Sequence, residues 1–267
     1  MAITEIRTIS FAGAGNVATH LAPALANAGY GIRHIVSRTA GRAEKLAQLT
    51  GGIPSADPSV IDDSADLLLL AISDHAIPGF VAGLKALGRF HGIVAHTSGS
   101  QPLSAISQHF GRAGIFYPLQ TFSKISNPDI RRVPFCIEGD SDETTTLLSA
   151  VAARVSDDVR LISSEQRAIL HLSAVFACNF TNHMYAIASR LIEKSGVAPD
   201  ILLPLIDETA KRLQGQDPAL LQTGPAVRGD VSTIEKHLRM LEGEAELQQI
   251  YTMLSENIRR YNDELKR

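Results

Sequence analysis

A glycine-rich segment near the N-terminus constrains the fold of this chain more than any other feature of its sequence. Gly13-Ala14-Gly15-Asn16-Val17-Ala18 follows a strand-like stretch at 7–12 and opens a helical pattern at 16–28. A strand that turns through glycines into a helix directs the free N–H groups of the helix N-terminus at one point, where they hold phosphate groups. The spacing G-x-G-x-x-A therefore predicts a βαβ unit that binds a dinucleotide.

The small residues of this segment have separate expected roles. Gly13 permits the tight turn, Gly15 lets a pyrophosphate approach the backbone, and Ala18 keeps the helix close to the sheet. A tight turn without a ligand is the alternative, and the strand-turn-helix context favours the dinucleotide. The expected contacts of the pyrophosphate are Gly13, Ala14, Gly15, Asn16 and Val17.

The end of the second expected strand indicates which dinucleotide is bound. Sites for NAD usually place Asp or Glu there to bind the ribose, but residues 31–43 contain neither. The chain has Ser37-Arg38-Thr39 instead, and the planar guanidinium of Arg38 suits the additional phosphate of NADP. The alternative is a solvated Arg38, with Thr39 only capping the next helix. The missing acid also argues against an S-adenosylmethionine methyltransferase, and the chain has no P-loop motif.

Strand-like and helix-like segments alternate through the first 160 residues. The continuous apolar run at 65–72, for example, suits a strand that is buried on both faces. This alternation predicts a parallel sheet with helices on both faces. The expected strands are 7–12, 31–37, 65–72, 92–96, 114–117, 133–138 and 159–162, and the expected helices are 16–28, 40–49, 75–87 and 142–154.

The pattern changes after residue 161. Ser163 and Gln166 have the spacing of a capping box, which marks the start of a helix that continues to about 195. No later segment alternates like a strand, and further helices are expected at 200–214, 232–241 and 243–266. The predicted fold class is therefore α/β, with an N-terminal doubly wound Rossmann domain at 1–160 and an all-α domain at 161–267.

The long helix after residue 163 combines an apolar stripe with a polar strip. We expect the stripe to be buried, since its members recur at intervals of three or four residues or their sums. They are Ile169, Leu172, Phe176, Phe180, Ile187 and Leu191. Beside them, His171, Cys178 and Asn182 fall on nearly one helical line, with Asn179 about a quarter-turn away. This polar strip is the expected substrate-facing surface.

Two further strand ends are expected to contact the cofactor, because ligands bind at the carboxyl ends of the strands in such sheets. The first is Ile72-Ser73-Asp74, where small residues leave room for a ribose and Asp74 can cap the following helix. The second is His96-Thr97-Ser98-Gly99, which should lie near the nicotinamide, with Thr97 and Ser98 as the expected contacts. Each segment has the alternative of being a loop without a ligand.

The composition excludes several classes of partner. The chain of 267 residues has 25 basic and 28 acidic side chains, a net charge of −3, so no broad cationic surface is expected for nucleic acid. Two widely separated cysteines predict neither a disulfide framework nor a zinc site. The N-terminus lacks the pattern of a signal peptide, and the longest apolar run is too short to span a membrane. We therefore expect a cytoplasmic protein without a bound metal.

The chain resembles a family of Rossmann-like, NADP-dependent oxidoreductase-type proteins with a C-terminal helical domain of unknown function. The superfamily includes 6-phosphogluconate dehydrogenase, ketopantoate reductase and pyrroline-5-carboxylate reductase. The resemblance covers essentially the whole chain. Besides the glycine segment and Ser37-Arg38, it rests on Tyr117-Pro118-Leu119-Gln120-Thr121-Phe122, His171-Leu172-Ser173-Ala174, Asn179, Thr223-Gly224-Pro225 and Arg228-Gly229-Asp230.

This resemblance implies a homodimer formed through the helical domain and a small-molecule substrate near Tyr117 and Gln120. Members often carry His where this chain has Tyr117, and that departure weakens a proposal of an acid at the position. Dehydrogenases of the superfamily commonly carry a Lys with an Asn one turn later. Here the corresponding positions are His171 and Val175, so the pair is not reproduced.

The candidate chemistry rests on His171, Asn179, Asn182 and Arg228. His171 is the expected proton donor for hydride transfer from NADPH to a carbonyl or imine carbon, and a structural core histidine is the alternative. His171 and Asn179 lie about 12 Å apart along the helix axis, so they can line one cleft but cannot bind one atom. Arg228 suits a substrate carboxylate, against the alternative that its loop simply turns the chain and caps the next helix.

The sequence thus predicts an NADP-dependent oxidoreductase for a small, anionic carbonyl or imine substrate. The missing Lys-Asn pair keeps a rival prediction open, namely a redox sensor or scaffold that binds NADP without turnover. A deazaflavin as second redox partner is compatible with either reading.

Overall fold

The computed structural model describes residues 3–123, 125 and 128–266 of the chain. These residues form two compact units, Met1–Asn182 and His183–Arg267. The sequence pattern changes near residue 160, whereas the compact units divide within a long helix. The first unit therefore contains the whole sheet together with the first helix of the predicted helical half.

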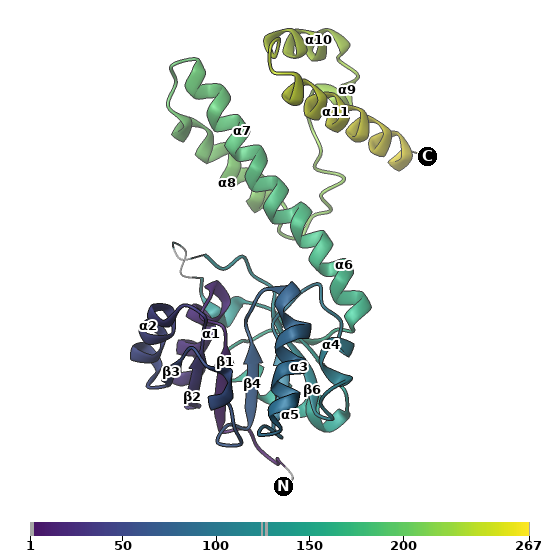
Figure 1. Cartoon of the computed structure of the whole chain (residues 1–267). Coiled ribbons are helices and arrows are strands. Elements are labelled where there is room, and N and C mark those ends of the chain that lie inside the picture. The colour runs from purple at the N-terminus through teal and green to yellow at the C-terminus, as the bar shows by residue number, and fades with distance from the viewer. Residues whose placement is uncertain (1–2, 124, 126–127, 267) are drawn as a thin grey trace. The chain divides into compact units, whose positions relative to one another are not determined.

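The first unit is built on an eight-stranded sheet with the order β3-β2-β1-β4-β5-β6-β7-β8 (Figure 1). From β1 the chain winds outward through β2 and β3, and it then returns to place β4 on the other side of β1. This reversal is the topological switch point of a doubly wound sheet, so the predicted fold class is confirmed. The strands are β1 Thr8–Ala12, β2 Gly31–Val36, β3 Ile53–Ser55, β4 Leu67–Leu70, β5 Ile93–His96, β6 Ala113–Pro118, β7 Phe135–Gly139 and β8 Val159–Leu161.

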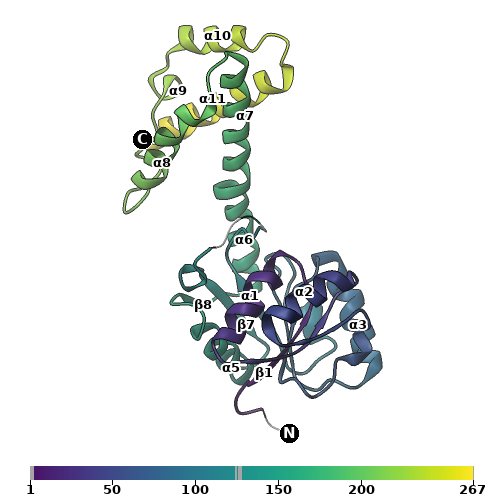
Figure 2. The ribbon, with the colours of Figure 1, turned by 90° about the vertical axis from the view of Figure 1, so that its left-hand side faces the viewer.

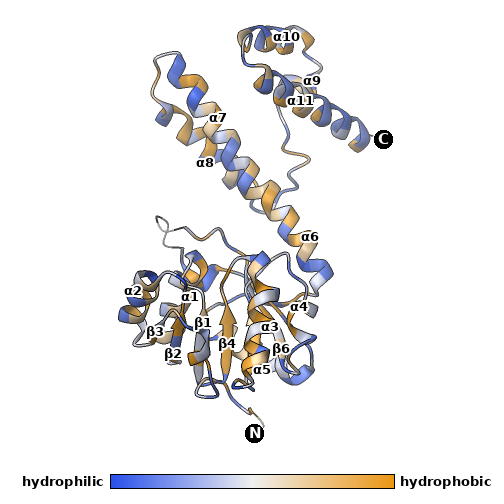
Figure 3. Cartoon of the chain, viewed as in Figure 1, coloured by the Kyte–Doolittle hydropathy of each residue, from blue (hydrophilic) through white to orange (hydrophobic). Residues whose placement is uncertain are grey.

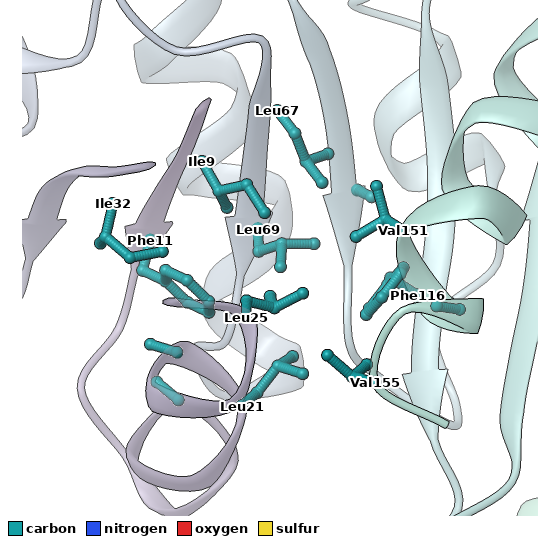
Figure 4. Packing of buried hydrophobic residues seen from close by; sticks show 14 of the residues in the cluster. Ile9, Phe11, Leu21, Leu25, Ile32, Leu67, Leu69, Phe116, Val151 and Val155 are labelled. Carbon is teal, nitrogen blue, oxygen red and sulfur yellow. The ribbon is translucent and has the colours of Figure 1, made fainter. Parts of the chain in front are cut away.

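Helices cover both faces of this sheet. On one face, α1 (Asn16–Asn27), α2 (Ala40–Thr50) and α5 (Asp142–Ala153) pack on the strands, as Figure 4 shows for Leu21 and Leu25. On the other face lie α3 (Ile77–Leu87) and the short α4 (Ser104–Ser107). Alternate leucines of β4 belong to opposite clusters, which is why this strand needs an unbroken apolar run.

Two features of the sheet differ from the sequence prediction. The short edge strand β3 was not expected, because its exposed residues carry no apolar alternation. The strands β6 and β7 pair antiparallel, which is an exception within the predicted parallel sheet. The described residues between these strands form only a 3-10 turn, Ile130–Arg132, so no crossover helix carries the chain back to the starting edge. The sheet is therefore mostly parallel, as predicted, with one antiparallel pair among the described strands.

The long helix begins where the capping box predicted. Ser163 accepts a hydrogen bond from Gln166 N, and the Gln166 side chain accepts one from Ser163 N. The expected continuous helix is interrupted, however: α6 (Ser164–Ala174) passes through a π-helical turn, Val175–Phe180, into α7 (Thr181–Lys194). The extra residue in this turn shifts the helical register, so the predicted single line through 171, 178 and 182 does not hold.

The apolar stripe of this helix is not buried in the chain. Ile169 is 65% exposed, Phe176 62% and Phe180 50%, and hydrophobic colour recurs along α6 and α7 in Figure 3. The prediction of a buried stripe is wrong for a physical reason. A period of 3.6 residues identifies an apolar face of a helix, but it does not say that the same chain covers that face.

The second unit contains no strand among its described residues, in agreement with the predicted all-α half. After α7 it comprises α8 (Leu203–Arg212), α9 (Pro225–Arg228), α10 (Val231–Met240) and α11 (Ala245–Leu265). The short α9 packs against both α10 and α11 (Figure 2). Glu244, just before α11, pairs with Arg190 and Lys194 of α7. No helix in the described part of the chain is long and apolar enough to span a membrane.

Candidate active site

The glycine loop forms one wall of a cavity of about 500 Å³, called here the nucleotide cavity. The loop is held in place because Gly13 N donates to Val36 O at 2.7 Å and Ala71 N donates to Ala12 O at 2.7 Å. Gly13 has φ +110°, and a Cβ atom there would lie 2.2 Å from Ala71 O. A Cβ at Gly15 would meet nothing closer than 4.0 Å, so the backbone there faces open space. This is the geometry expected where a phosphate approaches backbone N–H groups.

The far end of the nucleotide cavity carries positive charge. Ser37, Arg38 and Thr39 line it as predicted from the sequence, and Arg42 on the first turn of α2 lines it as well. Both guanidinium groups belong to exposed residues that a ligand can reach. Thr39 stands at the N-cap position of α2 without a side-chain capping bond, which leaves its hydroxyl available. Sequence reasoning missed Arg42, although its position four residues after Arg38, near a helix start, was a usable signal.

Only part of the strand end Ile72-Ser73-Asp74 lines the nucleotide cavity. Ile72 and Ser73 line the nucleotide cavity, whereas Asp74 does not. Asp74 accepts a hydrogen bond from Ser100 Oγ, and the expected capping of the next helix by its side chain is absent. Its carboxylate therefore ties two loops together.

Thr97 and Ser98 are buried and line neither main cavity. The Thr97 hydroxyl donates to Leu70 O, and Ser98 Oγ accepts from the backbone of the following turn. Burial lowers the pKa of the adjacent His96 to about 4, so its imidazole is neutral at physiological pH. These contacts fit the loop role that was the alternative for this segment.

A second cavity of about 640 Å³, called here the substrate cavity, adjoins the other side of the α1 N-terminus. Asn16 and Val17 of α1 line it, and Asn16 Nδ2 donates to Phe122 O at 3.1 Å. Asn16 therefore joins the glycine loop to the segment after β6. The remaining lining comes from 117–122 and from α6 with its π turn: Tyr117, Leu119, Gln120, Thr121, Phe122, Leu170, His171, Ser173, Ala174, Val175, Ala177, Cys178 and Asn179.

Tyr117 and His171 form a polar pair in the wall of the substrate cavity. Tyr117 Oη lies 3.3 Å from His171 Nδ1, and the rings meet edge to face. Burial raises the pKa of Tyr117 to about 12, so the phenol keeps its proton. Gly99 makes room for both rings, because a Cβ there would lie 2.5 Å from His171 Nδ1 and 2.9 Å from Tyr117 Cζ. No motif or periodicity in the sequence predicts that these three residues meet.

A buried ion pair anchors α6 one turn before His171. Arg167 Nη1 donates to Glu138 Oε2 of β7 at 2.7 Å, and Ser164 Oγ donates to the same oxygen at 2.7 Å. Arg167 Nη2 also donates to Gln101 O, which ties the helix to the loop after β5. The guanidinium is therefore held by β7 and by the loop after β5, and it fixes the start of α6 in turn.

The π turn brings further predicted residues to the cavity. Cys178 Sγ lies 3.1 Å from Thr121 Oγ1, and Asn179 lines the same cavity as His171. Asn182 does not line it, because the π turn changes the register beyond Phe180. Arg228 belongs to the second unit, where it is exposed at the end of α9. The next residues fit the turn-and-cap alternative, since Gly229 has φ +66° and Asp230 caps α10. No cluster suited to a metal ion occurs among the described residues.

Two family models match the chain on either side of the segment after β6. One describes a Rossmann-like domain and matches residues 4–119, and the other describes a domain of unknown function, DUF2520, and matches residues 133–258. A protein of known structure from Bacteroides fragilis, BF3122, is 40% identical over 97% of this chain and 100% of its own, with a TM-score of 0.89. The chain belongs to this two-domain family. BF3122 is described provisionally as an NADP oxidoreductase.

More distant solved structures share the fold of the family. A pyrroline-5-carboxylate reductase from Coxiella burnetii is 17% identical, with coverage of 97% of this chain and 98% of its own and a TM-score of 0.57. A reductive aminase from Aspergillus terreus, solved with NADPH and ethyl-5-oxohexanoate, is 17% identical over 98% and 95%, with a TM-score of 0.66. No curated protein matches the chain in sequence.

Proposed function

We propose that this protein is an NADP-dependent oxidoreductase that transfers hydride to or from a small carbonyl or imine substrate. The observation that carries the proposal is the position of the α1 N-terminus between two cavities. One cavity holds the glycine loop with Arg38 and Arg42, and the other holds His171 and Tyr117. The description of BF3122 as an NADP oxidoreductase supports the same reading.

The residues of the nucleotide cavity fit NADP. Gly15 leaves the backbone open to a pyrophosphate, and the helix N-terminus favours negative charge there. Arg38 and Arg42, with the hydroxyls of Ser37 and Thr39, suit a phosphate on the ribose. When bound, the reduced cofactor supplies the hydride, and the protein supplies orientation and proton transfer.

The substrate cavity provides groups for proton transfer and orientation. In our proposal, His171 is the source of the proton, and Gln120 and Asn179, which line the same cavity, orient the substrate. A carboxylate on the substrate is a finer part of the proposal. The prediction that Arg228 binds this carboxylate rests on the planar geometry of its guanidinium, which suits bidentate binding.

We further propose that the protein is a homodimer of the cytoplasm. The apolar stripe of α6 and α7 is exposed in the single chain, and a second copy would remove that surface from water. Both cysteines are free, which suits a reducing compartment.

The nucleotide assignment is tested by changing Arg38 to Ala. We expect the affinity for NADPH to fall about 10- to 100-fold, because charge-assisted hydrogen bonds contribute about 1.5–3 kcal/mol. The weaker affinity for NADH should not change, since NADH lacks the additional phosphate. Titration calorimetry measures both values, and Arg33→Ala serves as the control, because Arg33 is exposed on β2 and does not line the cavity. Equal losses for both coenzymes would contradict the assignment of Arg38.

Gly99→Ala tests whether the pair in the substrate cavity takes part in turnover. The added Cβ must push the rings of His171 and Tyr117 apart, because it would lie less than 3 Å from both. Misplacement of a reacting group by about 1 Å costs on the order of 100-fold in rate, so we expect a loss of this size in kcat. The affinity for NADPH should stay near that of the unmodified protein. If kcat were unchanged in Gly99→Ala, the pair of His171 and Tyr117 would have no part in turnover.

A redox sensor or scaffold that binds NADP without turnover is the second candidate function. It is favoured by the absence of a Lys at the position of His171, where dehydrogenases of the superfamily commonly carry one. Oxidation of NADPH in the presence of a panel of keto acids and cyclic imines distinguishes the two functions. Tight cofactor binding without oxidation across the panel would favour the sensor.

A further inference from the structure

The phenol of Tyr117 is held by the sheet, whereas the imidazole of His171 reaches it from a helix. Tyr117 lies near the carboxyl end of β6, which is hydrogen-bonded to a strand on each side. The glycine loop follows the carboxyl end of β1 and so belongs to the same edge of the sheet. The phenol therefore has a fixed position at the edge where ligands of such sheets bind.

The two side chains differ in their access to water. Tyr117 is 9% exposed, whereas His171 is half-buried, so solvent protons reach the imidazole more readily than the phenol. Other titratable or charged groups act on the phenol from neighbouring elements: Cys136 on β7, Arg167 on α6 and Asp74 before α3. Burial is the strongest influence and raises the pKa of Tyr117 to about 12. Once such a phenol has donated its proton, a neighbouring acid must restore the proton before the next turnover.

Building on the proposed function, we propose that Tyr117 delivers the proton to the substrate and that His171 restores it. When bound, NADPH would supply a hydride to the substrate carbon, and the electron pair of the C=O or C=N π bond would then remain on oxygen or nitrogen. That atom takes the proton from Tyr117 Oη as the O–H bond breaks. The protonated His171 passes its Nδ1 proton to the phenolate oxygen and becomes neutral. His171 then recovers a proton from solvent, so each turnover consumes one hydride and one proton.

The contact between the imidazole of His171 and the phenol of Tyr117 could not be predicted from the sequence. In the structure, α6 brings the imidazole of His171 to 3.3 Å from the phenol oxygen. In the proposal, neutral His171 accepts a hydrogen bond from the phenol O–H at Nδ1, so its own proton is on Nε2. The pair therefore has a signature that needs neither cofactor nor substrate.

Nitrogen NMR of imidazole-labelled protein tests this signature. We expect neutral His171 to populate the Nε2–H tautomer in the unmodified chain and to lose that preference in Tyr117→Phe, which removes only the hydroxyl group. The His171→Gln variant assigns the resonance. Tyr30→Phe is the matched control, since Tyr30 is a half-buried phenol far from the pair in sequence and outside both cavities. An unchanged tautomer in Tyr117→Phe would overturn the proposal.

Turnover of the best substrate of the panel tests the transfer of a proton from His171 through Tyr117 to the substrate, called here the relay. We expect Tyr117→Phe and His171→Gln each to lower kcat by roughly 10²- to 10⁴-fold, with NADPH affinity nearly unchanged. Because the two groups act as one unit, the double variant should be no slower than the slower single variant. Losses that multiply, or a fast Tyr117→Phe, would overturn the relay.

The outcomes also separate the relay from the function on which it rests. Turnover that survives in Tyr117→Phe but fails in His171→Gln leaves the proposed function intact and rejects the relay. If the unmodified protein oxidises NADPH with no member of the panel, the proposed function and the relay both fail. A coupled tautomer would then show that the pair is structural.

Discussion

Gly13→Ala is expected to abolish NADPH binding and to lower the free energy of unfolding by roughly 2–5 kcal/mol. A Cβ at this position would lie 2.2 Å from Ala71 O and 2.6 Å from Ala71 C, which are backbone atoms that no rotamer change can move. The backbone also has φ +110°, a conformation that alanine rarely adopts. Relief requires the loop to move away from β4, which displaces the N–H groups that face the pyrophosphate.

Calorimetry and urea denaturation check the two parts of this prediction. Gly83→Ala is the matched control, because Gly83 lies inside α3 with nothing within 4 Å of its added Cβ. That control should bind NADPH normally and gain about 0.5–1 kcal/mol of stability, since alanine favours a helix interior over glycine. If Gly13→Ala behaved like the control, the close approach of residues 13 and 71 would have no role in binding.

The parts of the site that the sequence predicts are those encoded by neighbours along the chain. The glycine loop, the strand before it and the helix after it lie within about twenty residues, and the expected elements were found at 8–12 and 16–27. Ser37 and Arg38 followed from their place directly after a strand. The apolar run at 65–72 likewise revealed a strand buried on both faces.

The parts that the sequence does not predict depend on contacts between distant segments. Tyr117, His171 and Gly99 meet only because β6, α6 and the loop after β5 come together, and no periodicity records that meeting. The antiparallel pairing of β7 follows from a connection without a crossover helix, a feature of the three-dimensional path. The π turn adds one residue to a helix whose sequence still reads as regular. In the first two cases, local patterns predicted the type of element but not its neighbour, and in the third they missed a local change within a helix.

The ion pair between Arg167 and Glu138 leads to an asymmetric prediction. The Arg167 side chain is 1% exposed and that of Glu138 is 19% exposed, so water can reach the carboxylate but not the guanidinium. Arg167 Nε already lacks a partner among the described residues. Glu138→Gln leaves the buried cation without a countercharge, and we expect a loss of about 3–5 kcal/mol in the free energy of unfolding. Arg167→Met removes the buried charge itself, and the methionine side chain occupies part of the space of the arginine. We expect it to lower the free energy of unfolding by only about 1–3 kcal/mol.

Urea denaturation at neutral pH measures this difference, and Arg160→Met provides the control. Arg160 pairs with Asp158 at 2.8 Å, but its side chain is 63% exposed, so its loss should change the stability little. Because Arg167 precedes His171 by one turn of α6, Glu138→Gln should also lower kcat at temperatures where the variant remains folded. If Glu138→Gln cost no more than the exposed control, the guanidinium would be solvated in the folded protein. The position of His171 would then depend only on the packing of α6, and not on the ion pair between Arg167 and Glu138.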